Sequence, residues 1–350
     1  MSAPVRVALL GFGNVGRALV EIVAEGGVPV RVVSVTDRSG TVVDENGLDA
    51  KRLLAAKLGK GAVSAYGAGY REWSSAEAAA RSPADVVVQV TPTDLASCEA
   101  AVAEIEAAFS AGRDVVTAAK GALALDPGRL RKLGEQYGRA LASSAAVAGA
   151  VPVLEVLDGA FRGDKLLHLE GVLNGSTTHI LSQLEQGVPF ERALAEARAA
   201  GILETDPSLD LLGLDAAAKA AILHQRAYGS DLSIKDVQTV GITGLTAKEC
   251  QGARASGFAV RLVARVSADG ARVRPLYVPS ESPLAVSGRK NAIRLVFESA
   301  GEIALTGAGA GPRETAGAVL SDVLTIARTR KPAGVKARAG PARAAELLTP

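Results

Sequence analysis

The amino-acid sequence predicts an α/β protein built of two domains. In the first 142 residues, short apolar runs alternate with segments of helical periodicity, which is typical of a parallel sheet covered by helices. Farther along the chain, helical segments are followed by paired β-rich runs around turns such as Asp269-Gly270, which indicates a mixed α+β arrangement. A chain of 350 residues is long enough to build both cores.

The first apolar run leads directly into a glycine-rich turn. Residues 5–10 read as a buried strand, residues 11–16 spell GFGNVG, and a helical segment and a second strand ending at Asp37 follow. This order is the setting that a Rossmann dinucleotide-binding motif requires. The alternative is a glycine-rich turn in another kind of α/β protein. The residues predicted to lie against the dinucleotide are Gly11, Phe12, Gly13, Asn14, Val15 and Gly16.

The sequence leaves the choice between NAD and NADP open. Asp37 could accept a hydrogen bond from the ribose 2′-hydroxyl, which favours NAD. Arg38 follows it directly and could face a 2′-phosphate, which favours NADP, or it could be a solvated loop charge.

Two further strands are expected to bring residues to the same edge of the sheet. The run 84–94 carries Thr91-Pro92-Thr93 at its end, and the run that starts at Arg113 ends at Lys120-Gly121. Because ligands of a parallel sheet bind beyond the carboxyl ends of its strands, we expect these residues beside the nicotinamide ring. The alternatives are a plain turn for Thr91-Pro92 and an exposed loop position for Lys120.

We place a domain boundary near residue 143. Residues 1–142 are expected to form the dinucleotide-binding domain, completed by a returning helix at 307–328. Residues 143–306 are expected to form the substrate-binding and dimerisation domain. The glycine-rich turn that opens the returning helix would bring Gly311 to the cofactor. Residues 329–350 are rich in Lys, Arg, Pro and Ala and are expected to be disordered.

Two stretches of the second domain carry candidate chemistry. Gly175-Ser176 form a turn into a helix, which could hold a carboxylate or cap the helix. Residues 201–219 contain a loop that leads into an apolar helix, on which Asp215 and Lys219 are four residues apart and share a face. A lysine among apolar neighbours can carry a proton, whereas the plain alternative is a helix-stabilising ion pair.

The composition argues against several other functions. A net charge of +2 and an aromatic content of 3% fit neither a nucleic-acid-binding surface nor stacking on bases. Three scattered histidines and two cysteines fit no zinc motif, and so few cysteines suggest a reducing compartment. The sequence shows no signal peptide and no apolar run long enough to span a bilayer, so we expect a cytoplasmic protein without a membrane or nucleic-acid partner.

Taken together, these motifs resemble homoserine dehydrogenase. The stretch GILETDPSLDLLGLDAAAK at 201–219 is similar to that family's signature, and GFGNVG, VTPTD, VVTAAKGALA and GVLNGSTTHIL fall in the family's order. The resemblance implies NAD(P)-dependent interconversion of L-aspartate 4-semialdehyde and L-homoserine, in threonine and methionine biosynthesis. It also implies a homodimer. Because the chain carries neither a kinase nor an obvious regulatory domain, we expect a monofunctional enzyme without threonine control through such a domain.

The resemblance also implies roles for individual residues. Lys219 is similar in position to the catalytic proton donor and acceptor, and Lys120 to a second lysine near the reacting oxygen and the nicotinamide. The residues implied in substrate binding are Glu204, Asp215, Asp210, Gly175 and Ser176. Glu204 and Asp215 would hold the substrate's ammonium, with Asp210 supporting them, and Gly201 would lie near the cofactor.

The chain departs from the family pattern at two positions. Ala119 stands where the family usually has asparagine, which removes a hydrogen-bonding side chain near the nicotinamide. Ser144 stands where the family often has a glutamate beside a monovalent cation. The residues whose backbone carbonyls could still bind sodium or potassium are Val147, Gly149 and Val151.

Two other readings of the motifs remain. Another two-domain dehydrogenase, acting on an amino acid or a semialdehyde, would share the glycine-rich turn but not the two lysines. A nucleotide-sensing binding module without catalysis would need neither Lys120 nor Lys219.

Overall fold

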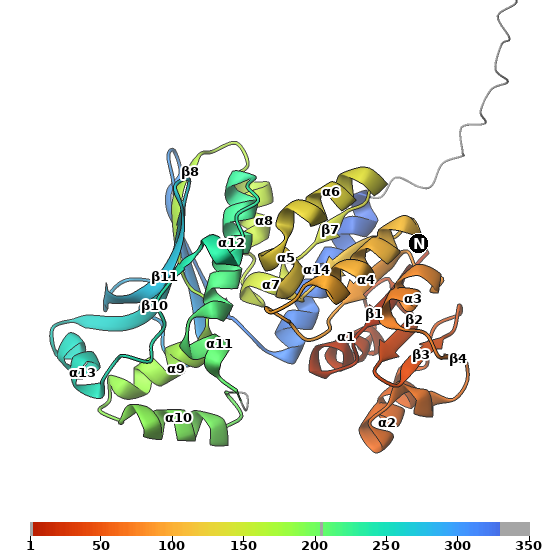
Figure 1. Ribbon diagram of the computed structural model, residues 1–350, viewed down its shortest axis with the longest axis horizontal. Coiled ribbons are helices and arrows are strands. Elements are labelled where there is room, and N and C mark those ends of the chain that lie inside the picture. The colour runs from red at the N-terminus through yellow and green to blue at the C-terminus, as the bar shows by residue number, and fades with distance from the viewer. Residues whose placement is uncertain (1–2, 204–205, 330–350) are drawn as a thin grey trace, which may run out of the picture.

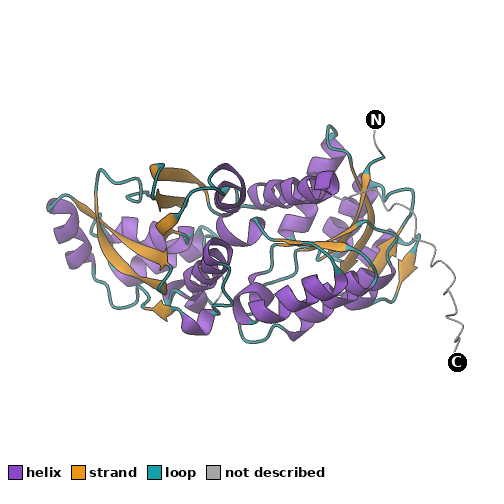
Figure 2. Ribbon diagram, turned by 90° about the horizontal axis from the view of Figure 1, so that it is seen from above, coloured by secondary structure: helices purple, strands orange, loops and turns teal. Residues whose placement is uncertain are grey.

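The computed structural model describes residues 3–203 and 206–329, and this part of the chain contains two sheets with helices around and between them (Figure 1, Figure 2). The first sheet lies at the right of Figure 1 and the second at the left. This architecture confirms the predicted α/β class, with a Rossmann-type sheet followed by a mixed α+β part. No helix in the described ranges is long and apolar enough to cross a membrane.

The first sheet has the strand order β4-β3-β2-β1-β5-β6-β7. Its strands are β1 (Val5–Leu10), β2 (Val30–Asp37), β3 (Gly40–Val43), β4 (Tyr70–Arg71), β5 (Val86–Gln89), β6 (Asp114–Thr117) and β7 (Leu141–Ala142). All neighbours from β2 to β7 are parallel, whereas β3 and β4 add antiparallel strands that the sequence did not predict. Leu10 pairs with Gln89 and Gln89 with Thr117, so β1, β5 and β6 end at one edge of the sheet.

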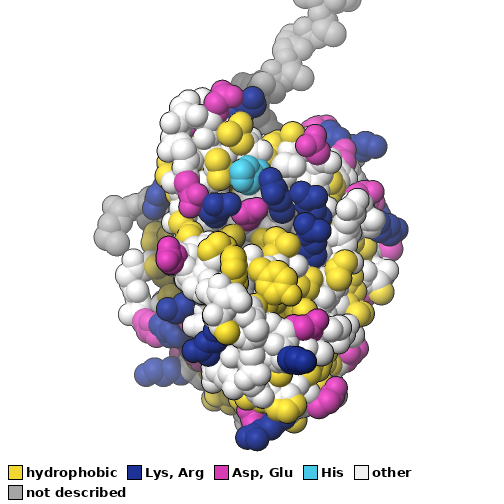
Figure 3. All heavy atoms as spheres, turned by 90° about the vertical axis from the view of Figure 1, so that its left-hand side faces the viewer, with side chains coloured by type: hydrophobic (Ala, Val, Ile, Leu, Met, Phe, Trp, Pro, Cys, Tyr) yellow, Lys and Arg dark blue, Asp and Glu magenta, His cyan; other side chains and the backbone are white. Residues whose placement is uncertain are grey.

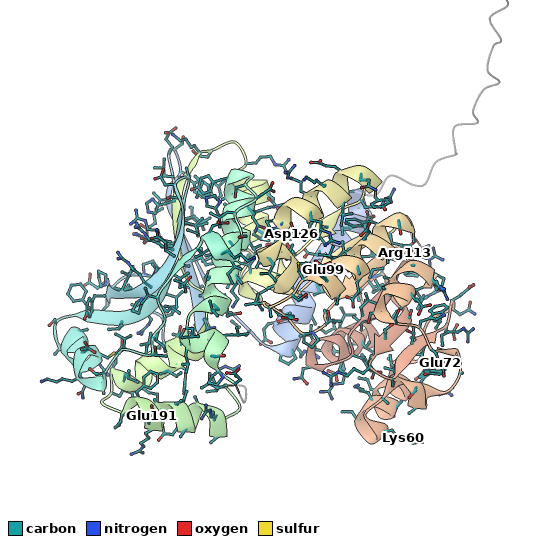
Figure 4. The ribbon with its side chains drawn as sticks, viewed as in Figure 1. Lys60, Glu72, Glu99, Arg113, Asp126 and Glu191 are labelled. Carbon is teal, nitrogen blue, oxygen red and sulfur yellow. The ribbon has the colours of Figure 1, made fainter. Side chains whose placement is uncertain are left out.

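Helices cover both faces of the first sheet. On one face, α1 (Asn14–Glu25) and α14 (Pro312–Thr329) pack together over the apolar side chains of β1. The other face is covered by α3 (Ser75–Arg81), α4 (Glu99–Ser110) and α6 (Pro127–Tyr137). Arg113, labelled in Figure 4, joins α3 to β6 by donating to the carbonyl oxygens of Ala80 and Ser82. The segment between β3 and β4 forms α2 (Ala50–Lys60) and the short turn η1 (Val63–Tyr66).

The second sheet has the strand order β13-β12-β8-β10-β11-β9. Its strands are β8 (Leu166–Val172), β9 (Gln238–Thr239), β10 (Phe258–Ser267), β11 (Gly270–Pro279), β12 (Lys290–Phe297) and β13 (Gly301–Ala308). The β10–β11 hairpin turns at Asp269-Gly270, as the sequence predicts. The helices packed on one face are α9 (Gly175–Leu184), α12 (Leu214–Tyr228) and α13 (Ala247–Ala255), and α10 (Phe190–Ala199) packs against α9.

Short helices lie between the two sheets (Figure 1). They are α5 (Lys120–Leu125), α7 (Ala145–Ala148), α8 (Val153–Glu155) and the π-helical turn η2 (Val156–Ala160). Lys120 therefore begins a helix and does not end a strand, because β6 already stops at Thr117. The returning helix begins at Pro312 and not at residue 307, because β13 continues through Ala308. Proline suits the first helical turn, where its missing N–H leaves no hydrogen bond unmade.

A buried carboxylate joins α14 to the segment that connects the two sheets. Asp322 is 7% exposed and accepts hydrogen bonds from the backbone amide of Ser144 at 2.9 Å and from its hydroxyl at 2.8 Å. Burial raises the pKa of Asp322 to about 6, although the hydrogen bonds from Ser144 act in the opposite direction. The folded protein thus holds this proton more tightly than the unfolded chain does.

We expect the free energy of unfolding to fall as pH rises from about 4 through 6, by up to about 3 kcal/mol from Asp322 alone. Asp322→Asn should flatten that part of the pH profile, because the amide does not titrate. Denaturant unfolding at pH 4.5 and pH 7 measures the difference. The control is Glu314→Gln, which neutralises an exposed carboxyl on the same helix. Parallel pH profiles for Asp322→Asn and the unmodified protein would contradict the expectation.

Candidate active site

The glycine-rich turn after β1 is shaped for close approach by a ligand. Gly11 has a φ of +98°, and a Cβ there would lie 2.7 Å from the carbonyl oxygen of Val90. A Cβ on Gly16 would lie 2.4 Å from the carbonyl oxygen of Gly11, so this glycine allows α1 to pack against the turn. Gly13 instead faces open space, and it precedes α1 without a side-chain cap. The first amides of α1 can therefore bind a phosphate, which fits a dinucleotide.

A cavity of about 880 Å³ runs along this turn. Its lining includes Gly11, Phe12, Gly13, Asn14, Val15, Asp37, Arg38, Lys57, Thr91 and Pro92. The structure thus brings most of the predicted cofactor residues together around one space. Gly16 lies behind the turn and does not line the cavity.

Asp37 is held by the protein itself. Its carboxylate accepts from the backbone amide of Ser39 at 2.8 Å, the hydroxyl of Ser39 at 2.6 Å, Lys57 Nζ at 2.5 Å and the amide of Val63 at 3.1 Å. Burial alone would raise the pKa of Asp37, but these hydrogen bonds lower it. A carboxylate offers about four acceptor positions, so a ribose hydroxyl would have to compete for them. Arg38 is exposed and faces the same cavity.

The two lysines come from different elements and share one carboxylate. Lys219 lies on α12, is 8% exposed, and its Nζ contacts Asp215 Oδ2 at 2.7 Å. The same Nζ donates to the carbonyl oxygen of Leu173 at 2.7 Å. Lys120, at the start of α5, places its Nζ 3.5 Å from Asp215 Oδ1. The i,i+4 ion pair is therefore present, and it is part of a larger cluster.

Asn174 organises the acidic side of this cluster. Its Nδ2 donates to Asp210 Oδ1 at 2.6 Å and to Asp215 Oδ2 at 2.9 Å, while its Oδ1 accepts from the amide of Thr177 at 2.8 Å. It thus caps α9 and fixes two carboxylates that come from α11 (Ser208–Leu211) and α12. Sequence reasoning missed this residue, although asparagine before a Gly-Ser-Thr turn is a helix-capping signal.

The two aspartates have opposite pKa shifts. Burial raises the pKa of Asp210, helped by the nearby charge of Asp215 and opposed by the hydrogen bond from Asn174. Burial would also raise the pKa of Asp215, but the charges of Lys219 and Lys120 hold it well below its usual range. Asp215 therefore stays ionised, whereas Asp210 holds a proton more tightly than an ordinary aspartate does.

These residues surround a second cavity, of about 490 Å³. Its lining includes Lys120, Val147, Gly149, Asn174, Gly175, Ser176, Asp210, Asp215, Lys219, Arg289 and Gly311. Asn14, Val15, Val90 and Thr91 line both cavities, so the glycine-rich turn and the lysine cluster adjoin. The arrangement can hold a dinucleotide beside a small molecule that carries both charged and reactive groups.

Some predicted site residues lie elsewhere. Gly201 is exposed just after α10, with a φ of +64°, and lines neither cavity. Val151 is buried away from both cavities, and its carbonyl oxygen accepts from the amide of Val153. Glu204 lies outside the described residues. Within the described ranges, no group of three or more His, Cys, Asp or Glu residues could hold a metal ion.

Family models match both parts of the chain. Residues 152–324 match the model described as homoserine dehydrogenase. Residues 2–111 match the model described as glutamate/leucine/phenylalanine/valine dehydrogenase. The second match covers only elements of the first sheet and its helices.

Individual relatives match nearly the whole chain. The chain is 36% identical to the homoserine dehydrogenase of Methanocaldococcus jannaschii, over 93% of this chain and 99% of the relative. It is 32% identical to the NAD(+)-dependent homoserine dehydrogenase of Pseudomonas canavaninivorans, over 93% of this chain and 97% of that one. A hyperthermophilic archaeal homoserine dehydrogenase solved in complex with NADPH superposes with a TM-score of 0.83 at 32% identity, covering 94% of this chain and 99% of the other. The chain belongs to the homoserine dehydrogenase family.

Proposed function

We propose that the protein interconverts L-aspartate 4-semialdehyde and L-homoserine with NAD or NADP, on the route to threonine and methionine. The observation that carries this proposal is the continuity of the two cavities. An open dinucleotide-binding turn adjoins a space lined by two lysines and two aspartates. A cofactor bound at the turn supplies or accepts the hydride. The relatives bearing this activity match 93% of the chain.

Each polar group of the substrate has a matching group in the second cavity. We assign Lys219 to proton transfer at the reacting oxygen, with Lys120 as a second cation that stabilises developing alkoxide charge. Asp215 and Asp210 are assigned to the substrate's ammonium, together with Glu204. The backbone amides of Gly175 and Ser176, at the start of α9, are assigned to its carboxylate. For the described residues, this assignment is supported by the lining of the cavity, whereas Glu204 rests on the family resemblance alone.

We assign the cofactor to the turn at 11–16, the Thr91-Pro92 segment and Gly311, and we leave out Gly201, which lines neither cavity. In the same proposal, residues 1–142 and α14 form the cofactor domain, and residues 143–306 form the substrate domain. Packing of α14 against α1 supports that division.

Arg38→Ala is expected to raise KM for NADP about 5- to 10-fold and to leave KM for NAD within about twofold, because only NADP carries the 2′-phosphate. Lys57, 2.5 Å from Asp37, would keep part of the phosphate affinity in that variant. Initial rates with both cofactors measure the effect. Lys60→Ala is a matched control, because Lys60 (Figure 4) is exposed on α2 and does not line the cavity. Equal changes for both cofactors would remove Arg38 from the 2′-phosphate site.

The direct test of the activity is oxidation of L-homoserine by the purified protein, with NAD and NADP side by side. We expect reduced cofactor to form with at least one of them. No turnover with either cofactor, in a protein that still binds them, would discard the proposal.

We also propose a monovalent cation at the carbonyls of Val147 and Gly149, whereas the carbonyl oxygen of Val151, the third predicted ligand, already accepts from the amide of Val153. In the described structure, no backbone amide contacts the carbonyl oxygens of Val147 or Gly149, which supports their availability. Ser144 has no carboxylate to offer there, and its hydroxyl donates to Asp322 instead. Activity in sodium or potassium chloride should exceed activity in tetramethylammonium chloride. Equal activity in all three salts would remove the cation from the proposal.

We further propose a homodimer formed through the face of the second sheet opposite α9 and α12. Glu170, Arg265 and Arg294 form ion pairs on this face. Figure 3 shows the corresponding side of the molecule, where charged side chains gather around a hydrophobic centre. Light scattering should give twice the chain mass of 35.6 kDa, and a monomer mass would rule the dimer out. The free thiols of Cys98 and Cys250 support the proposed cytoplasmic location.

A further inference from the structure

Lys120, Lys219 and Arg289 are the basic residues among the described residues that line the second cavity, and Arg289 differs from the two lysines in its contacts. Lys120 and Lys219 both contact Asp215, at 3.5 Å and 2.7 Å. Arg289 lines the same cavity but makes no ion pair or side-chain hydrogen bond within the described part of the chain. Its guanidinium charge is therefore available to an anionic group of a bound ligand.

Arg289 lies next to the start of α9. It directly precedes β12, and a Cβ built on Gly175 would come within 2.8 Å of the Arg289 carbonyl oxygen. The backbone segments around Arg289 and Gly175 are thus in direct contact. Burial and the charge of Arg289 both lower the pKa of His179, one turn farther along α9. The positive charge of Arg289 therefore acts on the N-terminal part of α9.

The substrate of the proposed reaction has three polar groups, and two of them already have matching partners. The ammonium is matched by Asp210 and Asp215, and the reacting oxygen by the lysines. The α-carboxylate needs hydrogen-bond donors or a cation on a different side of the cavity. Among the described cavity residues, the amides of Gly175 and Ser176 and the guanidinium of Arg289 meet that need.

We infer that Arg289 recognises the α-carboxylate of the substrate, together with the first amides of α9. This inference rests on the proposed function, since it takes the substrate to be an amino acid. Arg289 acts here as a specificity-determining residue, because it binds the end of the substrate away from the reacting carbon. It distinguishes a free amino acid from an amide, an ester or a plain amino alcohol of the same length.

Removing Arg289 should weaken substrate binding and leave the chemical step nearly intact. We expect Arg289→Ala to raise KM for L-homoserine about 5- to 20-fold. This loss of binding is larger than that expected for an exposed ion pair and smaller than that expected for a buried charge-assisted hydrogen bond. The kcat should stay within about threefold, because the guanidinium contacts no reacting atom. Arg289→Lys should recover part of the loss, since a lysine keeps the charge but not the bidentate geometry.

The decisive experiment compares L-homoserine with L-homoserinamide, in which a neutral carboxamide replaces the carboxylate. The ratio of the two kcat/KM values measures recognition of the carboxylate charge. In Arg289→Ala this ratio should fall about 5- to 20-fold, because only the charged substrate loses its partner. Lys290→Ala is the matched control: Lys290 is the neighbouring exposed cation and does not line the cavity. It should leave the ratio unchanged.

The outcomes separate this inference from the proposed function. An unmodified protein that does not oxidise L-homoserine refutes the function itself. Normal oxidation with an unchanged substrate ratio in Arg289→Ala refutes the role of Arg289 alone. A change in KM for the cofactor, with the substrate ratio unaffected, would place the guanidinium at a phosphate and overturn the inference as well. A second test needs no variant: rising ionic strength should raise KM for L-homoserine more than KM for the amide, because an exposed charge is screened by salt. Equal rises would count against the inference.

Discussion

Lys219→Ala is expected to lower kcat for L-homoserine oxidation by at least about 100-fold, which is the scale of general acid–base catalysis. KM for the cofactor should change little, because Lys219 lines the substrate cavity and not the cavity along the glycine-rich turn. Its Nζ is oriented by Asp215 and by the carbonyl oxygen of Leu173, each at 2.7 Å, so alanine removes a positioned proton carrier.

The fold should tolerate this substitution. Asp215 would remain beside Lys120 and would keep the hydrogen bond from Asn174 Nδ2, so its buried charge would still be compensated. Steady-state kinetics and thermal unfolding of the same preparation separate a chemical defect from misfolding. Lys235→Ala is a suitable control, because Lys235 is exposed in the turn η3 (Ile234–Asp236). Near-normal turnover by Lys219→Ala would mean that Lys120 or water transfers the proton, and it would refute the role assigned to Lys219.

The features that the sequence predicts well are local ones. The turn at 11–16 depends on glycines within one short segment, and the positive φ of Gly11 and the close approach of Gly16 to Gly11 arise inside it. The shared face of Asp215 and Lys219 follows from helical spacing alone, and the structure adds the ion pair between them. In both cases, the physical cause lies within a few residues of the chain.

The features that the sequence does not predict depend on contacts between distant segments. Asn174 meets Asp210 and Asp215 because α9 begins beside α12, and no local pattern encodes that approach. Lys120 reaches the cluster from the first residue of a helix, although the apolar run suggests a strand that continues to it. Two of the four hydrogen bonds to Asp37, from Lys57 and from Val63, likewise depend on how α2 and η1 fold over β2.

The two departures from the family pattern have different structural settings. Ala119 is 3% exposed, and its amide contacts the hydroxyl of Thr117 at 3.1 Å, so the missing asparagine leaves a compact turn and no open gap. Ser144 instead gains a partner, because its amide and hydroxyl both bind Asp322 of α14. A carboxylate therefore remains one hydrogen bond away from the position where the family often has a glutamate.

Asp215→Asn is expected to lower kcat/KM for L-homoserine about 100- to 1000-fold, which corresponds to removing one partner of a buried ion pair. The carboxylate is shared by Lys219, Lys120 and Asn174, so a neutral amide leaves two ammonium groups close together without a counter-charge. Those groups would then repel the ammonium of the substrate. Asp210→Asn should lower kcat/KM less, about 10-fold, because no lysine within the described ranges lies at ion-pair distance from Asp210. Asp231→Asn, at an exposed carboxylate paired with Arg131, is the control.

A substrate without the amino group separates the two roles of Asp215. If this carboxylate binds the substrate's ammonium, Asp215→Asn should reduce kcat/KM more for L-homoserine than for 4-hydroxybutyrate. If it acts only by positioning Lys219 and Lys120, both substrates should lose the same factor. A kcat/KM for L-homoserine within about threefold of the unmodified protein would contradict both roles. The contacts of Asp215 with the two lysines, at 2.7 Å and 3.5 Å, would then have only a structural role. A buried carboxylate that took part in binding or catalysis could not be removed without a large loss of kcat/KM.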